Sequence, residues 1–127
     1  MEIPATFLVG LLGWSSCWLL ASVVGLWAMR PRGFWRSFWF MSGLWCVVNT
    51  LIVCYAIVAP PESLESFRRI LLINAGLDVG YIVVGGVLLA MKRPMLRGFG
   101  AAVCVQGLFL LAFDLVWWEL LRPAASP

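Results

Sequence analysis

Four long apolar runs, separated by short charged turns, constrain the fold of this chain more than any other feature of its sequence. They cover about residues 5–28, 38–58, 70–91 and 99–121. An apolar run of about 20 residues matches the hydrocarbon core of a bilayer. Backbone amides have no water to bond there, so each run is predicted to be a helix.

Only 12% of the residues are charged, against about a quarter in soluble domains. We therefore predict an all-α polytopic membrane protein. It would be a four-transmembrane-helix bundle forming one membrane domain over residues 1–127, with a tail at 122–127.

The basic residues are distributed unevenly between the two ends of these runs. The turns after the first and third runs hold six of the nine basic residues and no acid: Arg30, Arg32, Arg36, Lys92, Arg93 and Arg97. The opposite end holds the other three, Arg68, Arg69 and Arg122, beside four glutamates. The excess of Lys and Arg faces the cytoplasm in membrane proteins, so both termini are predicted to lie outside. This uneven distribution of basic residues argues against insertion of the chain in both orientations.

The first run is too long for a cleavable signal peptide, so we expect it to remain as a membrane helix.

The residue types that hold cofactors are scarce in this chain. It contains no histidine, and its four cysteines lie within the runs without any Cys-x-x-Cys pair. Haem and zinc sites usually require imidazole or paired thiolates. We therefore predict no cofactor and no metal centre built on these groups, and we interpret the cysteines as small apolar fillers.

The two basic turns resemble each other, since "AMRPRGF" (28–34) and "AMKRPMLRGF" (90–99) share a helix-ending Ala-Met and an Arg-Gly-Phe. Aligning them pairs the first run with the third and the second with the fourth. The chain would then consist of two pseudo-repeated helical hairpins related by an axis along the membrane normal. This alignment sets Ser16 against Asp78 and Asn49 against Asp114, so polar positions fall on polar positions.

Polar residues interrupt the apolar runs at a similar depth. At 100° per residue, Asn74, Asp78 and Tyr81 share one face of the third run. Gly76 and Gly80 form a Gly-x-x-x-Gly pair on the opposite face, where another helix could pack closely. The other runs contribute Ser42, Cys46 and Asn49 along one stripe, Asp114 and Gln106 from the fourth run, and Ser15 and Ser16 from the first. Asp78, Asp114 and Asn49 each lie about 12 to 16 Å from the outer end, and Gln106 and Tyr81 lie deeper, toward the cytoplasm. The sequence therefore predicts one polar layer, built on Asp78, Asp114, Asn49, Asn74, Tyr81, Gln106 and Ser16.

Two classes of function are compatible with this layer. Intramembrane Asn and Asp residues often hold helices together, which would make the protein a structural or accessory membrane subunit. Carboxyl groups without a basic partner must carry a proton, bind a cation or reach water, which would make it a small transporter or an ion-binding protein. That site would take a proton, a metal cation or a cationic small molecule. An enzyme is not predicted, because no nucleophile and base can be paired. The expected partners are the lipid bilayer and a second copy or larger membrane complex, with no nucleic acid.

The deep tryptophans allow two interpretations. Trp14, Trp18 and Trp45 lie too far along their runs for the interfacial belt that membrane helices carry. We expect them to pack between helices, although aromatic rings also surround bound cations.

Three stretches resemble a known family. "FWFMSGLWCVVN" (38–49), "NAGLDVGYIVVGG" (74–86) and "GFGAAVCVQGLFLLAFD" (98–114) are similar to the signature stretches of an uncharacterised family of small bacterial four-helix membrane proteins. The resemblance implies a multi-pass protein of the bacterial inner membrane and supplies no mechanism. Small multidrug exporters fit less well because they carry a glutamate in their first helix, and the pore motifs of fluoride channels are not visible.

Overall fold

Residues 2–123 are described by the computed structural model, and they form four α-helices and no strand. These are α1 (Ala5–Trp27), α2 (Phe34–Val58), α3 (Leu64–Leu89) and α4 (Pro94–Leu120). All four are long and apolar enough to cross a membrane. The predicted all-α architecture with four membrane-spanning helices is therefore confirmed for the described residues.

Three helices begin earlier than their apolar runs. α2 starts at Phe34 rather than 38, α3 at Leu64 rather than 70, and α4 at Pro94 rather than 99. The predicted starts followed hydropathy, but a helix continues through charged residues at the membrane surface when its first turn is stabilised. The Ser63 side chain caps α3 by accepting a hydrogen bond from the Ser66 backbone N–H at 3.1 Å. Proline at the start of α4 is pre-organised for the first turn.

The predicted tail covers residues 122–127. Leu121 ends α4 as its C-terminal cap, and Arg122 and Pro123 follow it outside the helix. The remainder of the tail, residues 124–127, lies outside the described residues.

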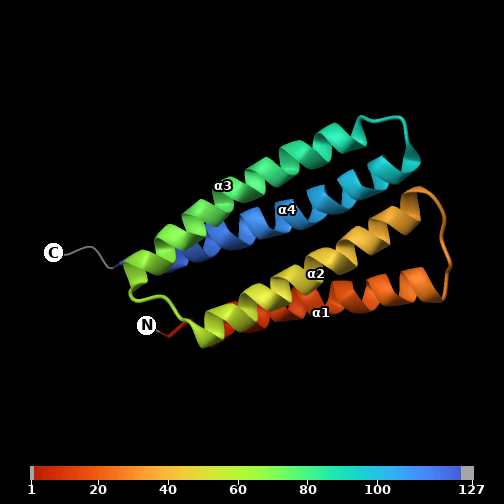
Figure 1. Cartoon of the computed structure of the whole chain (residues 1–127). Helices are drawn as coiled ribbons and strands as arrows, with labels where there is room; N and C mark the ends of the chain where they lie inside the picture. Colours follow the sequence, from red (N-terminus) through yellow and green to blue (C-terminus); the bar gives the residue numbers. More distant parts are fainter. Residues whose placement is uncertain (1, 124–127) are drawn as a thin grey trace.

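The helices form two antiparallel hairpins, α1 with α2 and α3 with α4 (Figure 1). The two hairpins are joined mainly by α2 packing along α4. Both ends of the described chain lie at the end of the bundle that also holds the α2–α3 turn, while the α1–α2 and α3–α4 turns lie at the other (Figure 1). This arrangement is the one expected of two parallel hairpins, and duplication of a sequence repeat stays a prediction.

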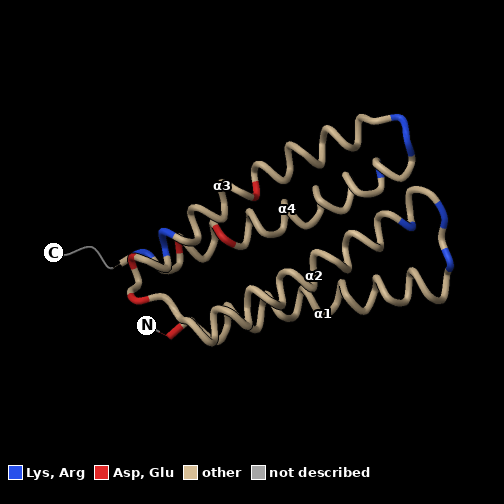
Figure 2. Tube along the Cα trace, in the orientation of Figure 1, with Lys and Arg blue, Asp and Glu red and all other residues tan. Residues whose placement is uncertain are grey.

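Charge is segregated along the bundle axis. Figure 2 shows the Lys and Arg residues of the two turns at one end, without an acidic neighbour there. The opposite end mixes both signs, and the two ion pairs found in the described chain, Arg69–Glu65 and Arg122–Glu119, belong to it. Two further acids lie within the helices, one midway along α3 and one on α4 nearer the mixed-charge end (Figure 2).

An aromatic cluster closes the mixed-charge end. The Phe7 ring of α1 contacts Phe67 of α3 edge-on at 5.3 Å between ring centroids, and it also contacts Phe113 and Trp117 of α4. Arg68 lies over the Trp118 ring and donates a hydrogen bond to the Trp118 carbonyl oxygen at 3.2 Å. These contacts connect α1, α3 and α4 at the end where the hairpins meet.

The closest helix approach occurs at glycines other than the predicted pair. A Cβ placed on Gly98 would overlap the Phe34 carbonyl oxygen of α2, and one on Gly100 would meet the Gly85 carbonyl oxygen of α3 at 2.5 Å, so α4 touches both helices backbone to backbone. A Cβ on Gly76 or Gly80 would meet nothing within 4 Å. The expectation that Gly76 and Gly80 hold a neighbouring helix is therefore not met within the described chain. The cause is that the polar face of α3, and not the opposite face, turns toward α4.

Candidate functional site

The two membrane-embedded aspartates lie together in the interior of the bundle. Asp78 of α3 retains 3% of its surface and Asp114 of α4 retains 6%. Both side chains line the same small cavity. The two acids of the predicted layer therefore form a buried pair.

The pair lines a small cavity at the junction of three helices. Its volume is about 110 Å³, and a water molecule occupies about 30 Å³ in the liquid, so about three waters would fill it. The polar residues around it are Asn49 of α2, Asn74, Asp78 and Tyr81 of α3, and Asp114 of α4. The other lining residues are Trp45, Val48, Ile52, Leu77 and Leu110. Val48, Ile52 and Leu77 are 41%, 50% and 51% exposed, so the cavity has a polar floor and an apolar rim on the lipid-facing surface.

Helix periodicity brings these side chains together. Asn74, Asp78 and Tyr81 are spaced by four and then three residues, which places them on one face of α3. Gly107 supplies the space on α4: a Cβ there would meet Ile82 at 3.0 Å and the Asp78 carbonyl oxygen at 3.5 Å. The missing side chain allows α4 to approach α3 next to Asp78, so Asp114, about two turns further along, reaches the same cavity.

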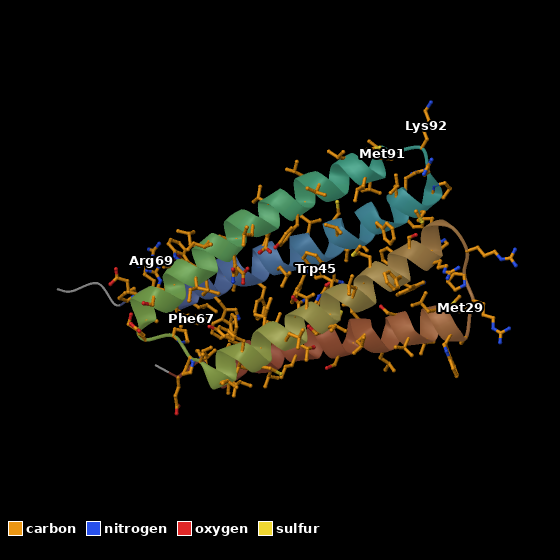
Figure 3. The ribbon with its side chains drawn as sticks, in the orientation of Figure 1. Met29, Trp45, Phe67, Arg69, Met91 and Lys92 are labelled. Carbon is orange, nitrogen blue, oxygen red and sulfur yellow. The ribbon has the colours of Figure 1, made fainter. Side chains whose placement is uncertain are left out.

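Several buried polar atoms at this site have no hydrogen-bond partner within the protein. They are Oδ2 of Asp78, Nδ2 of Asn49 and Nε1 of Trp45. The Trp45 ring meets the Tyr81 ring edge-on at 4.9 Å between centroids, and Figure 3 shows Trp45 midway along α2. Buried polar groups are paired in most proteins, so a cavity with unpaired donors and acceptors has the chemistry of a binding site for water or a small ion.

No basic side chain is available to neutralise the carboxyl pair. The residues that line the cavity include none, and the runs 70–91 and 99–121 contain no Lys or Arg. A charged carboxylate costs about 2.5 to 3.5 kcal/mol at the centre of a membrane helix on insertion scales. The pair therefore requires a proton, a cation or water to compensate its charge.

Gln106 lies apart from this cavity. It is fully buried and accepts a hydrogen bond from Nε1 of Trp14 at 2.8 Å, which links α4 to α1. The Trp14 ring also stacks on Phe109, with centroids 3.7 Å apart. Nε2 of Gln106 has no partner. Gln106 is thus buried, but its hydrogen bond with Trp14 joins two helices and does not contribute to the cavity.

The predicted contribution of α1 is wrong by one residue. Ser16 is exposed, whereas Ser15 is 1% exposed. One residue rotates a side chain by about 100° around a helix, so only one of two adjacent serines can face inward. The correspondence of Ser16 with Asp78 in the hairpin alignment therefore joins an outward side chain to an inward one.

The structure also reveals a buried polar stripe that the sequence indicated only in part. One face of α2 is buried in the interior of the bundle, and its polar or sulfur-containing residues are Ser37, Ser42, Cys46 and Asn49. Ser42 and Cys46 are fully buried, and Ser22 of α1 is 1% exposed. The hydroxyl groups of Ser22 and Ser42 have no hydrogen-bond partner. The spacing of Ser42, Cys46 and Asn49 predicted the outer part of the stripe, whereas Ser22 gave no signal.

The arrangement offers two carboxyls and few other ligands. Within residues 2–123, no group of three or more His, Cys, Asp or Glu side chains is placed to hold a metal ion. Any cation in the cavity would therefore take oxygens from Asp78, Asp114, the amide side chains and water. Oxygen-only sets of this kind suit hard cations rather than zinc or copper.

These features define a class of protein, a small helical protein with four helices long and apolar enough to cross a membrane. The chain belongs to DUF6992, a family of unknown function, whose model matches residues 10–115. The matched segment includes all three resembling stretches and every residue of the cavity, and the predicted membership of an uncharacterised family is confirmed. None of the curated proteins and none of the solved structures compared matches this chain.

Proposed function

We propose that this protein binds a small inorganic cation, in exchange for protons, at the Asp78–Asp114 pair. The observation that carries the proposal is the convergence of two buried carboxyl groups on a cavity that holds no basic side chain. A protonated pair is neutral and tolerated in the membrane. A cation that replaces a proton keeps the site near neutrality, so the same groups serve both states.

The size of the cavity restricts the kinds of ligand that it can hold. About 110 Å³ accommodates an ion with one or two waters. Sites for drug-sized molecules usually reach about 300 Å³ or more. This difference favours a proton or an inorganic cation over the cationic small molecule that the sequence left open.

A purely structural polar layer, as in an accessory subunit, is the competing interpretation. Such a layer is expected to satisfy its polar groups internally, because each unpaired buried group costs free energy. Nε1 of Trp14 and Oε1 of Gln106 do so, while Nε2 of Gln106 stays unpaired. Asp78, Asn49 and Trp45 each retain an unpaired polar atom at the cavity. The gathering of these three unpaired atoms around one cavity that also holds two carboxyl groups favours binding. The experiment below separates the two interpretations.

We place the protein in a bacterial inner membrane with both termini outside and the two basic turns in the cytoplasm. The location follows from the family resemblance, and the orientation follows from six basic residues at one end against three at the other. We infer a binding role rather than catalysis, since the cavity presents no nucleophile with an adjacent base.

A thermal-unfolding screen of the purified protein tests the proposal. The protein would be measured in detergent with Na⁺, Li⁺, K⁺, Mg²⁺ or Ca²⁺ at several pH values. A cation at 100 times its Kd stabilises by about 2.7 kcal/mol, so one of these ions should raise the unfolding temperature by several degrees. Protons compete for the same carboxyls, so the required cation concentration should increase as the pH is lowered.

Variants make the test specific. Asp78→Asn and Asp114→Asn keep the shape and hydrogen-bonding capacity of the side chains, and each should abolish the cation-dependent shift while the helical content is retained. Glu62→Gln removes an acid outside the membrane spans and should leave the shift intact. A wild-type protein that responds to none of the five cations, or Asn variants that respond like the wild type, would overturn the proposal.

A further inference from the structure

A groove at the basic end of the bundle is lined by three arginines from the α1–α2 turn and the start of α2. Arg30 and Arg32 lie in the α1–α2 turn, and Arg36 lies in the first turn of α2. Together with Leu26, Pro31 and Phe40 they line a groove of about 490 Å³. We call these six residues the basic groove. Its volume falls in the range of about 300 to 1,000 Å³ that is usual for small-molecule sites.

The charge of the basic groove is not neutralised within the described chain. No acidic residue lies at this end (Figure 2), and the ion pairs among the described residues are at the other end. Lys92 at the α3–α4 turn adds charge of the same sign to this end of the bundle (Figure 3). Three guanidinium groups without a counter-charge favour the binding of an anion. One arginine can donate two parallel hydrogen bonds to two oxygens of a phosphate group.

The start of α2 adds a second attraction for an anion. Its N-cap residue, Gly33, provides no side-chain hydrogen bond, and its first turn contains no acid. The first N–H groups of a helix lack internal partners and carry partial positive charge. Arg36 also occupies this turn, where a cation is unfavourable unless an anion is near. The α1–α2 turn before it has an unusual backbone conformation. Arg30 has a φ of +43°, which lies in a region that non-glycine residues seldom adopt.

The groove continues onto an apolar surface. Arg36 and Phe40 also line an adjoining cavity of about 410 Å³, between α2 and the start of α4, with Met95 and Phe99. Phe40 is 54% exposed and Met95 is 49% exposed. The cationic groove therefore borders an apolar surface, as the headgroup of a phospholipid borders its acyl chains.

We propose that the basic groove binds the phosphate headgroup of an anionic phospholipid, whose acyl chains lie along Phe40, Met95 and Phe99. Basic pockets between membrane helices on the cytoplasmic side are suited to such headgroups. This inference is independent of the cation site, because the two sites share no residue and lie at different depths.

Native mass spectrometry of the detergent-purified protein tests this assignment. The probes are phosphatidylglycerol, phosphatidylcholine and inorganic phosphate, each offered at equal concentration. We expect the wild type to retain phosphatidylglycerol in preference to phosphatidylcholine. One arginine near a membrane surface contributes about fivefold in binding to anionic lipid, so Arg32→Gln with Arg36→Gln should reduce that preference by at least tenfold.

A matched variant distinguishes a site from general attraction. Lys92→Gln with Arg93→Gln removes two charges from the same end without changing the basic groove, and it should keep the preference. Equal losses in the two double variants, or no loss in the groove variant, would overturn the proposal. Displacement of the lipid by inorganic phosphate at equal concentration would also overturn it, because the ligand would then be a soluble anion.

Arg36→Lys covers the case in which the double variant does not fold. It keeps the charge but loses the planar, two-pronged hydrogen-bond geometry of arginine. Weaker retention of phosphatidylglycerol by Arg36→Lys supports a defined headgroup site. Unchanged retention contradicts it.

Discussion

At the scale of single residues, the interior of this bundle contains two kinds of polar group. Nε1 of Trp14 donates a hydrogen bond to Oε1 of Gln106 across α1 and α4, whereas Asp78, Asn49 and Trp45 leave polar atoms unpaired at a cavity. The first kind contributes to stability. The second kind costs stability unless water or an ion completes its hydrogen bonds, and this difference is the basis for separating a structural contact from a binding site.

The Trp14–Gln106 hydrogen bond can be removed with little change in packing. Trp14→Phe keeps a ring to stack on Phe109 but loses the N–H donor, so unfolding in mixed detergent should become easier by about 0.6 to 1.7 kcal/mol. Trp27→Phe is the control, since Trp27 is 85% exposed and should tolerate the change. Adding Gln106→Leu to Trp14→Phe should restore part of the loss by removing the unpaired amide. Equal stability of Trp14→Phe and the wild type would show that the bond contributes nothing.

Much of the cavity could be predicted from helix periodicity. The spacing of Asn74, Asp78 and Tyr81 fixes a common face, and bilayer energetics require the two aspartates to face inward. Ser15 and Ser16 show the limit of this reasoning. Adjacent polar residues differ by about 100° in direction, and the hydropathy of an apolar run does not identify its inner side. The partner of Gln106 also depends on helix tilt, which the sequence does not encode locally.

At the scale of helices, close packing is achieved by glycines whose neighbours are backbone atoms. Gly85 and Gly100 bring α3 and α4 into contact, and Gly107 does so beside Asp78. The Gly-x-x-x-Gly pattern at Gly76 and Gly80 is the more conspicuous signal, yet that face of α3 is open. A sequence motif shows that a helix can be approached closely, but which helices meet depends on the whole bundle.

This difference predicts opposite effects of the same substitution on one hairpin. Gly100→Ala would place a methyl group against the Gly85 carbonyl oxygen, and relief by separating the helices should cost about 1 to 3 kcal/mol. Gly80→Ala meets nothing within 4 Å and should leave stability unchanged or slightly raised. Unfolding of both variants in mixed detergent gives the comparison. Destabilisation by Gly80→Ala would instead indicate that this face packs against a second copy.

At the scale of the whole molecule, the two ends of the bundle have different chemistry. One end holds both basic turns and the basic groove, and the other mixes acids and bases around an aromatic cluster. The predicted membrane-crossing architecture emerged from hydropathy because the bilayer imposes it on every helix. The assembly of the hairpins depends on contacts between distant residues, such as Phe7 with Phe67, which no local pattern specifies.

The proposed orientation, with both termini outside, predicts which turns are accessible in intact cells. Met29→Cys and Glu62→Cys place thiols in turns at opposite ends, at residues that are both exposed. A membrane-impermeant maleimide should label Glu62→Cys directly and Met29→Cys only after permeabilisation. The reverse pattern would invert the proposed orientation, and equal labelling would indicate insertion in both directions.

The central claim is that the buried aspartate pair exchanges protons for a cation, and infrared difference spectroscopy observes those carboxyl groups directly. The protein in lipid membranes would be perfused alternately with buffer and with Na⁺, Li⁺, K⁺, Mg²⁺ or Ca²⁺. For one of these ions, we predict loss of the protonated carboxyl band and gain of carboxylate bands, both absent in Asp78→Asn with Asp114→Asn. Spectra in which none of the five ions changes a carboxyl signal, or in which the double variant gives the same signal, would contradict the account.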